Sequence, residues 1–222
     1  LNAFHSTVRN LPRPFAGKLT EENRDQAIEH LLMISTAVFK QDMEDNTLHR
    51  SWLHRWTQHI PAYIDWQIKQ QQHWTVKRTE QQCETRLNEN DVTLHGRLDR
   101  IDMEKDQKGR QSIIDYKTGS MASQADVDRG EDVQLATYAL LAKDIGSVMY
   151  LSLDESDGAV KPRARLEGEN LYSLTLDVRD RLLGTIDMLQ QGQPLPAWGD
   201  ERTCSYCDLI GLCRKKVWDN AG

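Results

Sequence analysis

Two stretches of sequence decide the fold class: Gly96-Arg97-Leu98-Asp99-Arg100-Ile101-Asp102 and Ile113-Ile114-Asp115-Tyr116-Lys117-Thr118-Gly119. They belong to strand-like segments, residues 92–103 and 111–118, and the polar segment 104–110 between them contains a glycine and predicts a hairpin loop. Side chains of a strand alternate between its two faces, so Asp115 and Lys117 point the same way. We expect the hairpin to bring Asp99 beside them.

Helix and strand patterns surround this hairpin. Apolar residues at helical spacing predict helices over 27–39, 48–73, 133–143 and 170–191, and residues 75–87 and 147–153 have the character of strands. Pro61 is expected to kink or split the second helix, because proline cannot donate a backbone hydrogen bond. The order of these elements predicts an α/β fold with a helical N-terminal layer.

The acidic residues of the hairpin indicate a metal site. Two carboxylates that face one point repel each other unless a cation neutralises them, and Mg²⁺ or Mn²⁺ prefers carboxylate oxygens, water and substrate phosphate. Asp99 and Asp115 are therefore candidate metal ligands, and Lys117 would position or help deprotonate an attacking water. These groups suit phosphodiester hydrolysis. The alternative is an ordinary surface ion pair, which an Asp-x-Lys at a strand edge commonly forms.

The composition limits the classes to which the chain can belong. It has 222 residues with 28 Lys plus Arg and 34 Asp plus Glu, so its formal charge of −6 gives no general attraction for nucleic acid, and any such role needs a local site. No apolar run approaches the ~20 residues of a membrane span. Four cysteines are too few for a disulfide scaffold and no signal peptide is visible, so we expect a cytoplasmic protein.

The two motifs, together with Gln134-Leu-Ala-Thr-Tyr138, resemble the RecB-like branch of the PD-(D/E)XK nucleases. The resemblance implies a nuclease core in which helices flank a central mixed β-sheet. It implies that Asp99 and Asp115 bind the metal, that Lys117 is catalytic and that Asp102 is a second, structural acid.

Further site residues follow from the same resemblance. Gln134 and Tyr138 are four residues apart and share one helix face; in the family this pair borders the active site and contacts the metal site or DNA. The family also carries an acidic residue on the strand before the motif. Glu80 stands roughly at that position, with Glu84 as the competing choice.

One departure from the family pattern concerns a histidine. RecB-like nucleases usually carry a metal-binding histidine on a helix near the start of the domain, and His5 is a poor match for it. We expect that histidine to precede Leu1, in a longer protein of which this chain is a fragment.

Three cysteines near the C-terminus have the spacing C-x₂-C-x₅-C: Cys204, Cys207 and Cys213. Closely spaced thiolates in a reducing compartment usually bind metal, and we expect these three to lie together in space. Three ligands leave a tetrahedral Zn²⁺ or a four-iron cluster one short. Cys83 is a candidate fourth ligand, but a buried, inert thiol too far from the tail is the favoured interpretation.

The cysteine spacing resembles the iron–sulfur tail of AddB-type helicase–nuclease subunits and of some CRISPR adaptation nucleases. The resemblance implies a 4Fe–4S cluster whose first cysteine precedes the nuclease core, so the cluster would be absent or incomplete in this fragment. A plain zinc knuckle is the alternative. Basic residues near the tail are either phosphate contacts or a solvated basic end: Arg202, Arg214, Lys215 and Lys216.

We therefore expect residues 1–73 to form the helical N-terminal part of a nuclease domain, 74–192 its core and 193–222 a cysteine-rich tail. The expected function is that of a Mg²⁺-dependent (exo)deoxyribonuclease in a RecB/AddB-like helicase–nuclease for double-strand break repair. It would cut a single DNA strand delivered by a helicase region of the same chain or by a partner subunit. The alternatives are a non-catalytic DNA-end-binding or scaffold module with the same fold, and a zinc-binding interaction domain.

Overall fold

The computed structural model describes residues 18–43, 47–88, 92–106, 109–194, 199 and 204–213. The chain forms two compact units, Leu1–Asp180 and Arg181–Gly222, which divide within helix α6 (Gly168–Gln190). The first unit contains the β-sheet, and the second contains the short helix α8 (Ile210–Cys213). None of the described helices is long and apolar enough to cross a membrane.

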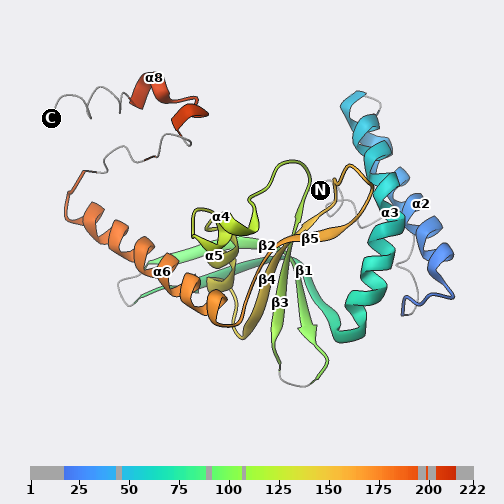
Figure 1. Cartoon of the computed structure of the whole chain (residues 1–222), viewed down its shortest axis with the longest axis horizontal. Coiled ribbons are helices and arrows are strands. Elements are labelled where there is room, and N and C mark those ends of the chain that lie inside the picture. The colour runs from blue at the N-terminus through green and yellow to red at the C-terminus, as the bar shows by residue number, and fades with distance from the viewer. Residues whose placement is uncertain are drawn as a thin grey trace. The chain divides into compact units, whose positions relative to one another are not determined.

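A five-stranded sheet with the strand order β1-β2-β3-β4-β5 lies at the centre of the first unit (Figure 1). Its strands are β1 (Trp74–Arg86), β2 (Thr93–Glu104), β3 (Gln111–Lys117), β4 (Ile145–Ser152) and β5 (Lys161–Glu167). Neighbouring strands are antiparallel except β3 and β4, which are parallel. A parallel pair needs a crossover, and this one contains α4 (Gln124–Asp128) and α5 (Gln134–Leu140). The predicted mixed sheet flanked by helices is confirmed.

Two N-terminal helices, α2 (Arg24–Met43) and α3 (Thr47–His73), pack on each other around buried Ala27, Ile60 and Ile64. α3 also covers one face of the sheet, where the aromatic side chains of Trp56, Tyr63 and Trp66 pack against a cluster built mainly from β3 and β4. Burial of this aromatic face stabilises the contact, since each aromatic ring removes a large apolar area from water. The predicted helical N-terminal layer is therefore present.

Helix α3 is one continuous helix with Pro61 inside it, so of the two expectations, a kink or a split, the split is wrong. Proline costs the helix one backbone hydrogen bond. Ile60 is fully buried beside it and Ile64 is buried one turn later, so packing against α2 stabilises the helix on both sides of the proline.

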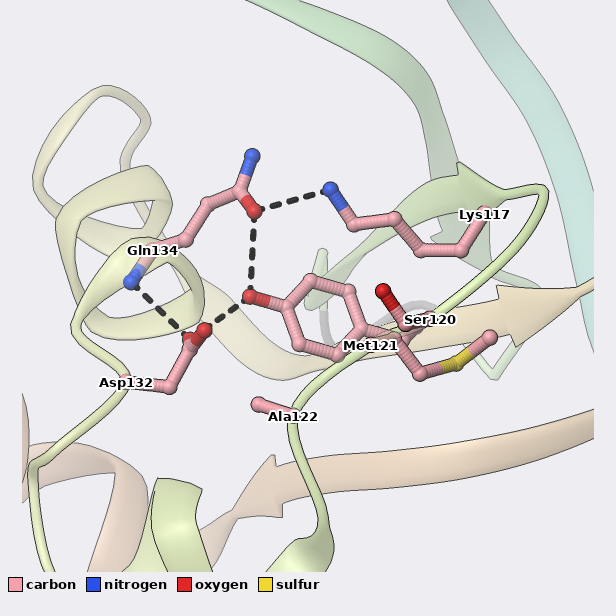
Figure 2. Close-up of a pocket in the computed structure, with 7 residues that line it drawn as sticks. Lys117, Ser120, Met121, Ala122, Asp132 and Gln134 are labelled. Atoms are coloured by element: carbon pink, nitrogen blue, oxygen red, sulfur yellow. Dashed lines mark hydrogen bonds between the residues drawn. The ribbon is translucent and has the colours of Figure 1, made fainter. Parts of the chain in front are cut away.

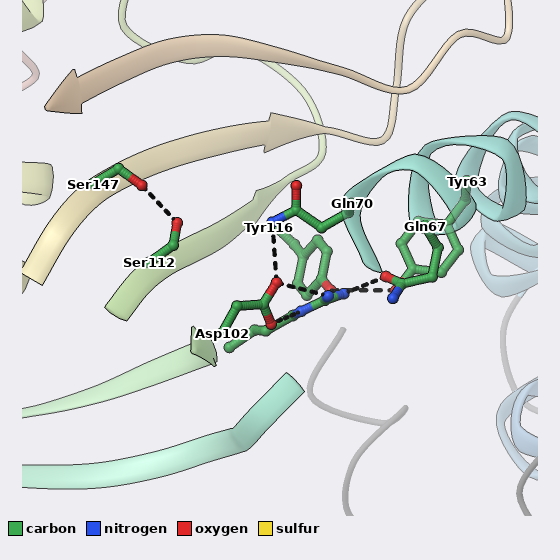
Figure 3. Close-up of polar contacts among 8 residues, drawn as sticks. Tyr63, Gln67, Gln70, Asp102, Ser112, Tyr116 and Ser147 are labelled. Atoms are coloured by element: carbon green, nitrogen blue, oxygen red, sulfur yellow. Dashed lines mark hydrogen bonds and ion pairs between the residues drawn. The ribbon is translucent and has the colours of Figure 1, made fainter. Parts of the chain in front are cut away.

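A buried polar network lies between α3 and the sheet (Figure 3). Arg100 donates to both carboxylate oxygens of Asp102 at 2.6 and 2.9 Å, and Asp102 is fully buried. Gln70 donates to Asp102, and Gln67 accepts from Arg100. Arg100 also donates to the hydroxyl of Tyr116 at 3.2 Å. The network therefore ties α3 to the middle of the sheet through paired rather than isolated buried charges.

The sequence patterns did not predict two elements of the first unit, β5 and α4. β5 reads as a charged segment with Pro162 near its start, and only Ala164 and Leu166 on it are buried, as expected for an edge strand. α4 is only five residues long, too short for a periodic signal. Its one sequence signal is a capping box, in which Ser123 accepts from the backbone N–H of Asp126 and Asp126 accepts from that of Ser123.

Candidate active site

The β2–β3 hairpin brings the two predicted metal ligands to the same face of the sheet. Its register pairs Arg100 with Ile114, and continuing this antiparallel register by one residue sets Asp99 opposite Asp115. Oδ2 of Asp99 accepts a hydrogen bond from the backbone N–H of Tyr116 at 3.0 Å. This face is opposite to the one covered by α3, since the side chains of Arg100 and Ile114 point towards α3 and their strand neighbours point away.

Asp115 is nearly buried, with 4 % of its surface exposed. Burial raises its pKa, the ammonium group of Lys117 lowers it and the charge of Asp99 raises it, with a net upward shift. Ionisation of Asp115 therefore costs more free energy than ionisation of an exposed carboxyl group. Lys117 Nζ lies 2.9 Å from Asp115 Oδ2 as an ion pair. The direction of this contact leaves Oδ2 without a well-aligned hydrogen-bond donor in the described part of the chain.

Lys117 has two further partners on this face. Its Nζ donates to Oε1 of Gln134 at 2.8 Å, a contact seen in Figure 2, and lies 5.0 Å from the ring centroid of Tyr150. The ammonium group is thus held by a carboxylate, an amide oxygen and an aromatic face, all of which favour its positive charge. Lysine has a flexible side chain, so three partners from three elements restrict it strongly.

The predicted pair Gln134 and Tyr138 shares one face of α5. Nε2 of Gln134 donates to the hydroxyl oxygen of Tyr138 at 2.7 Å. Burial raises the pKa of Tyr138 to about 12, and the negative charges of Asp115 and Asp99 contribute to the shift. The phenol therefore stays protonated at neutral pH beside both carboxylates.

The structure distinguishes the two candidate acids of β1 by position. Register pairs on either side of Glu80 set it across from Asp99, and its backbone has a positive φ of 50°. Its carboxylate forms an ion pair with Arg97 at 3.0 Å, and 18 % of its side chain is exposed. Glu84 lies further along β1, 66 % exposed and 3.5 Å from His95. Position thus favours Glu80 over Glu84 as the neighbour of Asp99.

A pocket of about 320 Å³ opens beside Lys117, lined by Asp132, Gln134, Tyr150 and the loop 120–122 (Figure 2). Gly119 precedes this loop with a φ of 93°, which favours glycine and lets the chain turn directly after β3. The sequence patterns did not point to Asp132 or Tyr150. Tyr150 pairs with Asp115 in the parallel β3–β4 register, which only the sheet order reveals.

The residues on this face fit a divalent cation with few protein ligands. The described part of the chain contains no group of three or more His, Cys, Asp or Glu side chains that would enclose a metal. Mg²⁺ is usually held by one or two carboxylates and completes its coordination with water and substrate phosphate. Asp99 and the buried, poorly satisfied Oδ2 of Asp115 meet that requirement. His5 lies outside the described residues.

The expected gathering of Cys204, Cys207 and Cys213 is not found in the described residues, since the three do not form a group able to hold a metal. The backbone N–H of Cys207 bonds to the carbonyl of Cys204 in one turn, whereas Cys213 ends α8. Cys207 and Cys213 are exposed, so burial does not draw the thiols together. The basic residues of the tail lie outside the described residues: Arg202, Arg214, Lys215 and Lys216.

The fourth cysteine, Cys83, lies on β1 and is half-buried. Its thiol donates to the carbonyl of Gln81 at 3.7 Å, and burial raises its pKa. A raised pKa disfavours the thiolate that binds metals. These surroundings are those of a structural thiol.

Comparison with known families agrees with this geometry. The model of the PD-(D/E)XK nuclease superfamily matches residues 2–214, so the chain belongs to that superfamily, whose members generally hydrolyse nucleic acids. A search of curated proteins gave no match. The predicted superfamily is thereby confirmed.

Proposed function

We propose that this domain is a metal-dependent deoxyribonuclease in which Asp99 and Asp115 bind Mg²⁺ or Mn²⁺ and Lys117 is the catalytic lysine. The observation that carries the proposal is the meeting of these three side chains on one sheet face, with a buried carboxylate oxygen beside a lysine ammonium group. When bound, the divalent cation supplies Lewis acidity, which stabilises negative charge on phosphate oxygens and lowers the pKa of water.

The chain's own side chains have separate tasks in this proposal. Asp99 and Asp115 would bind the cation. Its positive charge would offset the repulsion between the two carboxylates. Lys117 puts a positive charge beside the scissile phosphate and orients the attacking water, an effect that is strong in a site shielded from solvent. Gln134 holds Lys117 through its amide oxygen, and Tyr138 borders the carboxylates as a neutral hydrogen-bonding group. Glu80 is the candidate acid of the neighbouring strand.

The resemblance to RecB-like nucleases supports a narrower proposal. The domain would act as an exonuclease on a single DNA strand, within a RecB/AddB-like helicase–nuclease of double-strand break repair. A helicase region of the same protein or a partner subunit would deliver the strand. This narrower proposal is supported by the sequence motifs around Asp99, Asp115 and Gln134, and by the C-x₂-C-x₅-C spacing of the cysteines.

A 4Fe–4S cluster at Cys204, Cys207 and Cys213 remains part of this narrower proposal, with a fourth cysteine supplied from elsewhere in the full-length protein. In the described residues the three thiols do not form a group that could hold a metal ion. Binding of the cluster would therefore have to bring them together. The test is a longer protein, purified without oxygen and assayed for iron. About four irons per chain support the cluster, whereas an iron-free protein, or loss of its metal in a Cys83→Ala variant, contradicts this ligand set.

Cleavage of oligonucleotides labelled at the 5′ or the 3′ end tests the nuclease proposal. We expect products with Mg²⁺ or Mn²⁺, none with EDTA, and inhibition by Ca²⁺, which polarises water less well. Asp115→Asn and Lys117→Ala should abolish cleavage. Glu131→Gln is a matched control, since Glu131 is exposed and pairs with Arg129.

Three outcomes separate the rival functions. A wild-type chain that binds DNA ends without cutting them in any of these metals supports the scaffold module and contradicts the nuclease. Cleavage that survives EDTA contradicts a metal-dependent enzyme. A chain that binds zinc through its cysteines but neither binds nor cuts DNA supports a zinc-binding interaction domain.

A further inference from the structure

One carboxylate oxygen in the pocket holds two of the three partners of Lys117. Oδ1 of Asp132 accepts from the hydroxyl of Tyr150 at 2.7 Å and from the backbone N–H of Gln134 at 3.2 Å. Figure 2 shows Asp132 and Gln134 side by side, with the Gln134 amide reaching Lys117. We propose that Asp132 is a positioning residue for Lys117 that acts through Gln134 and Tyr150. The inference rests on the proposed nuclease function.

The contact with Gln134 sets the start of α5. Gln134 is the first residue of this helix, and the N-cap residue, Val133, has no side chain that accepts a hydrogen bond. Asp132 supplies the missing acceptor from one residue earlier, in the manner of an Asx turn. Its negative charge is also favourable at a helix N-terminus. Asp132 thereby sets the point from which the Gln134 side chain extends to Lys117.

The contact with Tyr150 sets the aromatic face beneath the ammonium group. Tyr150 is 1 % exposed, and its hydroxyl lies 2.7 Å from Asp132 and 3.1 Å from Oε1 of Gln134. A phenol has one proton, and the carboxylate is the stronger and nearer acceptor. Donation to Asp132 leaves Oε1 of Gln134 available for the Lys117 ammonium group, which it accepts at 2.8 Å.

Removal of the Asp132 carboxylate should affect Lys117 without touching the metal ligands. The Gln134 N–H would lose its acceptor, and the Tyr150 hydroxyl would keep only Oε1 of Gln134, 3.1 Å away, where it competes with the Lys117 ammonium group. A displacement of about 1 Å in a catalytic group costs on the order of 10²-fold in rate. DNA binding depends on phosphate contacts elsewhere along the strand and should change little.

Steady-state cleavage of a single-stranded oligonucleotide with Mn²⁺ tests the proposal. Asp132→Ala should lower kcat by roughly 10- to 100-fold and leave KM for DNA within about twofold. Asp132→Asn keeps an acceptor oxygen and should restore part of kcat. Tyr150→Phe keeps the ring and should cost less than Asp132→Ala. The double variant should be no slower than Asp132→Ala alone, because the hydroxyl acts through Asp132. Glu131→Gln, the neighbouring exposed acid, should keep the wild-type kcat.

The results that would overturn the role of Asp132 differ from those that would overturn the nuclease proposal. Wild-type kcat in Asp132→Ala, with Lys117→Ala inactive, overturns the positioning role and leaves the nuclease intact. Parallel losses of kcat, DNA binding and thermal midpoint in Asp132→Ala and Asp132→Asn alike overturn it in favour of a purely structural role. A wild-type chain that does not cut DNA overturns both proposals.

Discussion

Asp99 accepts a hydrogen bond from the backbone N–H of Tyr116 at 3.0 Å, and Tyr116 is the residue between Asp115 and Lys117 on β3. On the other face of the sheet, the Tyr116 hydroxyl receives a hydrogen bond from Arg100. One residue is therefore held from both faces, by an acid of the candidate site and by the buried network under α3. The positions of Asp115 and Lys117 follow from that double attachment, since they are its immediate neighbours.

Replacement of Asp99 should separate its structural and chemical tasks. Asp99→Ala leaves the Tyr116 N–H without its acceptor and should lower the free energy of unfolding by about 1–3 kcal/mol, with loss of cleavage. Asp99→Asn keeps an acceptor oxygen but lacks the charge that binds a cation, so it should stay close to wild type in stability and still fail to cut. Urea unfolding and a cleavage assay check both; an Asn variant with wild-type activity would remove Asp99 from the ligand set.

Loss of the buried ion pair should be costly. Asp102→Ala leaves the Arg100 guanidinium buried without its carboxylate, and we expect the free energy of unfolding to fall by about 3–5 kcal/mol. Glu131→Ala breaks an exposed pair with Arg129 and should cost at most about 1 kcal/mol. Denaturant unfolding of both variants makes the comparison. Equal and small effects would mean that the network under α3 contributes little to holding the sheet.

The raised pKa of Asp115 predicts a pH dependence of the metal-free protein. The folded state holds this proton more tightly than the unfolded chain, chiefly because the carboxyl group is buried. That contribution to stability is present below the unfolded pKa, about 3.9, and is lost as the pH rises through the raised folded pKa. Asp115→Asn has no such titration.

Unfolding in EDTA checks this prediction. Between about pH 4 and pH 7, the wild type should lose more free energy of unfolding than Asp115→Asn does. Identical slopes for the two proteins would show that Asp115 titrates as an ordinary exposed acid.

Strand periodicity was enough to predict the shared face of Asp99, Asp115 and Lys117, because a period of two and a hairpin leave little choice of geometry. The superfamily followed from the same strings. The sequence alone could not predict that Asp132 and Tyr150 lie near Lys117. Their proximity depends on the crossover and on the parallel β3–β4 pairing. β5 was missed because charged residues and Pro162 hide a strand that buries little.

The cysteine spacing is a case in which the sequence pattern predicted more than the structure shows. C-x₂-C-x₅-C predicted thiols lying together, but spacing specifies only which residues are able to meet. In the described residues Cys204 and Cys207 share one turn while Cys213 ends a separate short helix. Cys207 and Cys213 are exposed, so burial does not bring their thiols together.

The most direct test of the central claim measures Mn²⁺ binding and DNA cleavage in the same preparations, by electron paramagnetic resonance and by release of an end label. In the proposed mechanism the wild type binds Mn²⁺ and cuts DNA, Asp99→Asn and Asp115→Asn lose both, and Lys117→Ala binds Mn²⁺ without cutting. Mn²⁺ binding and cleavage at wild-type levels in Asp115→Asn would contradict it.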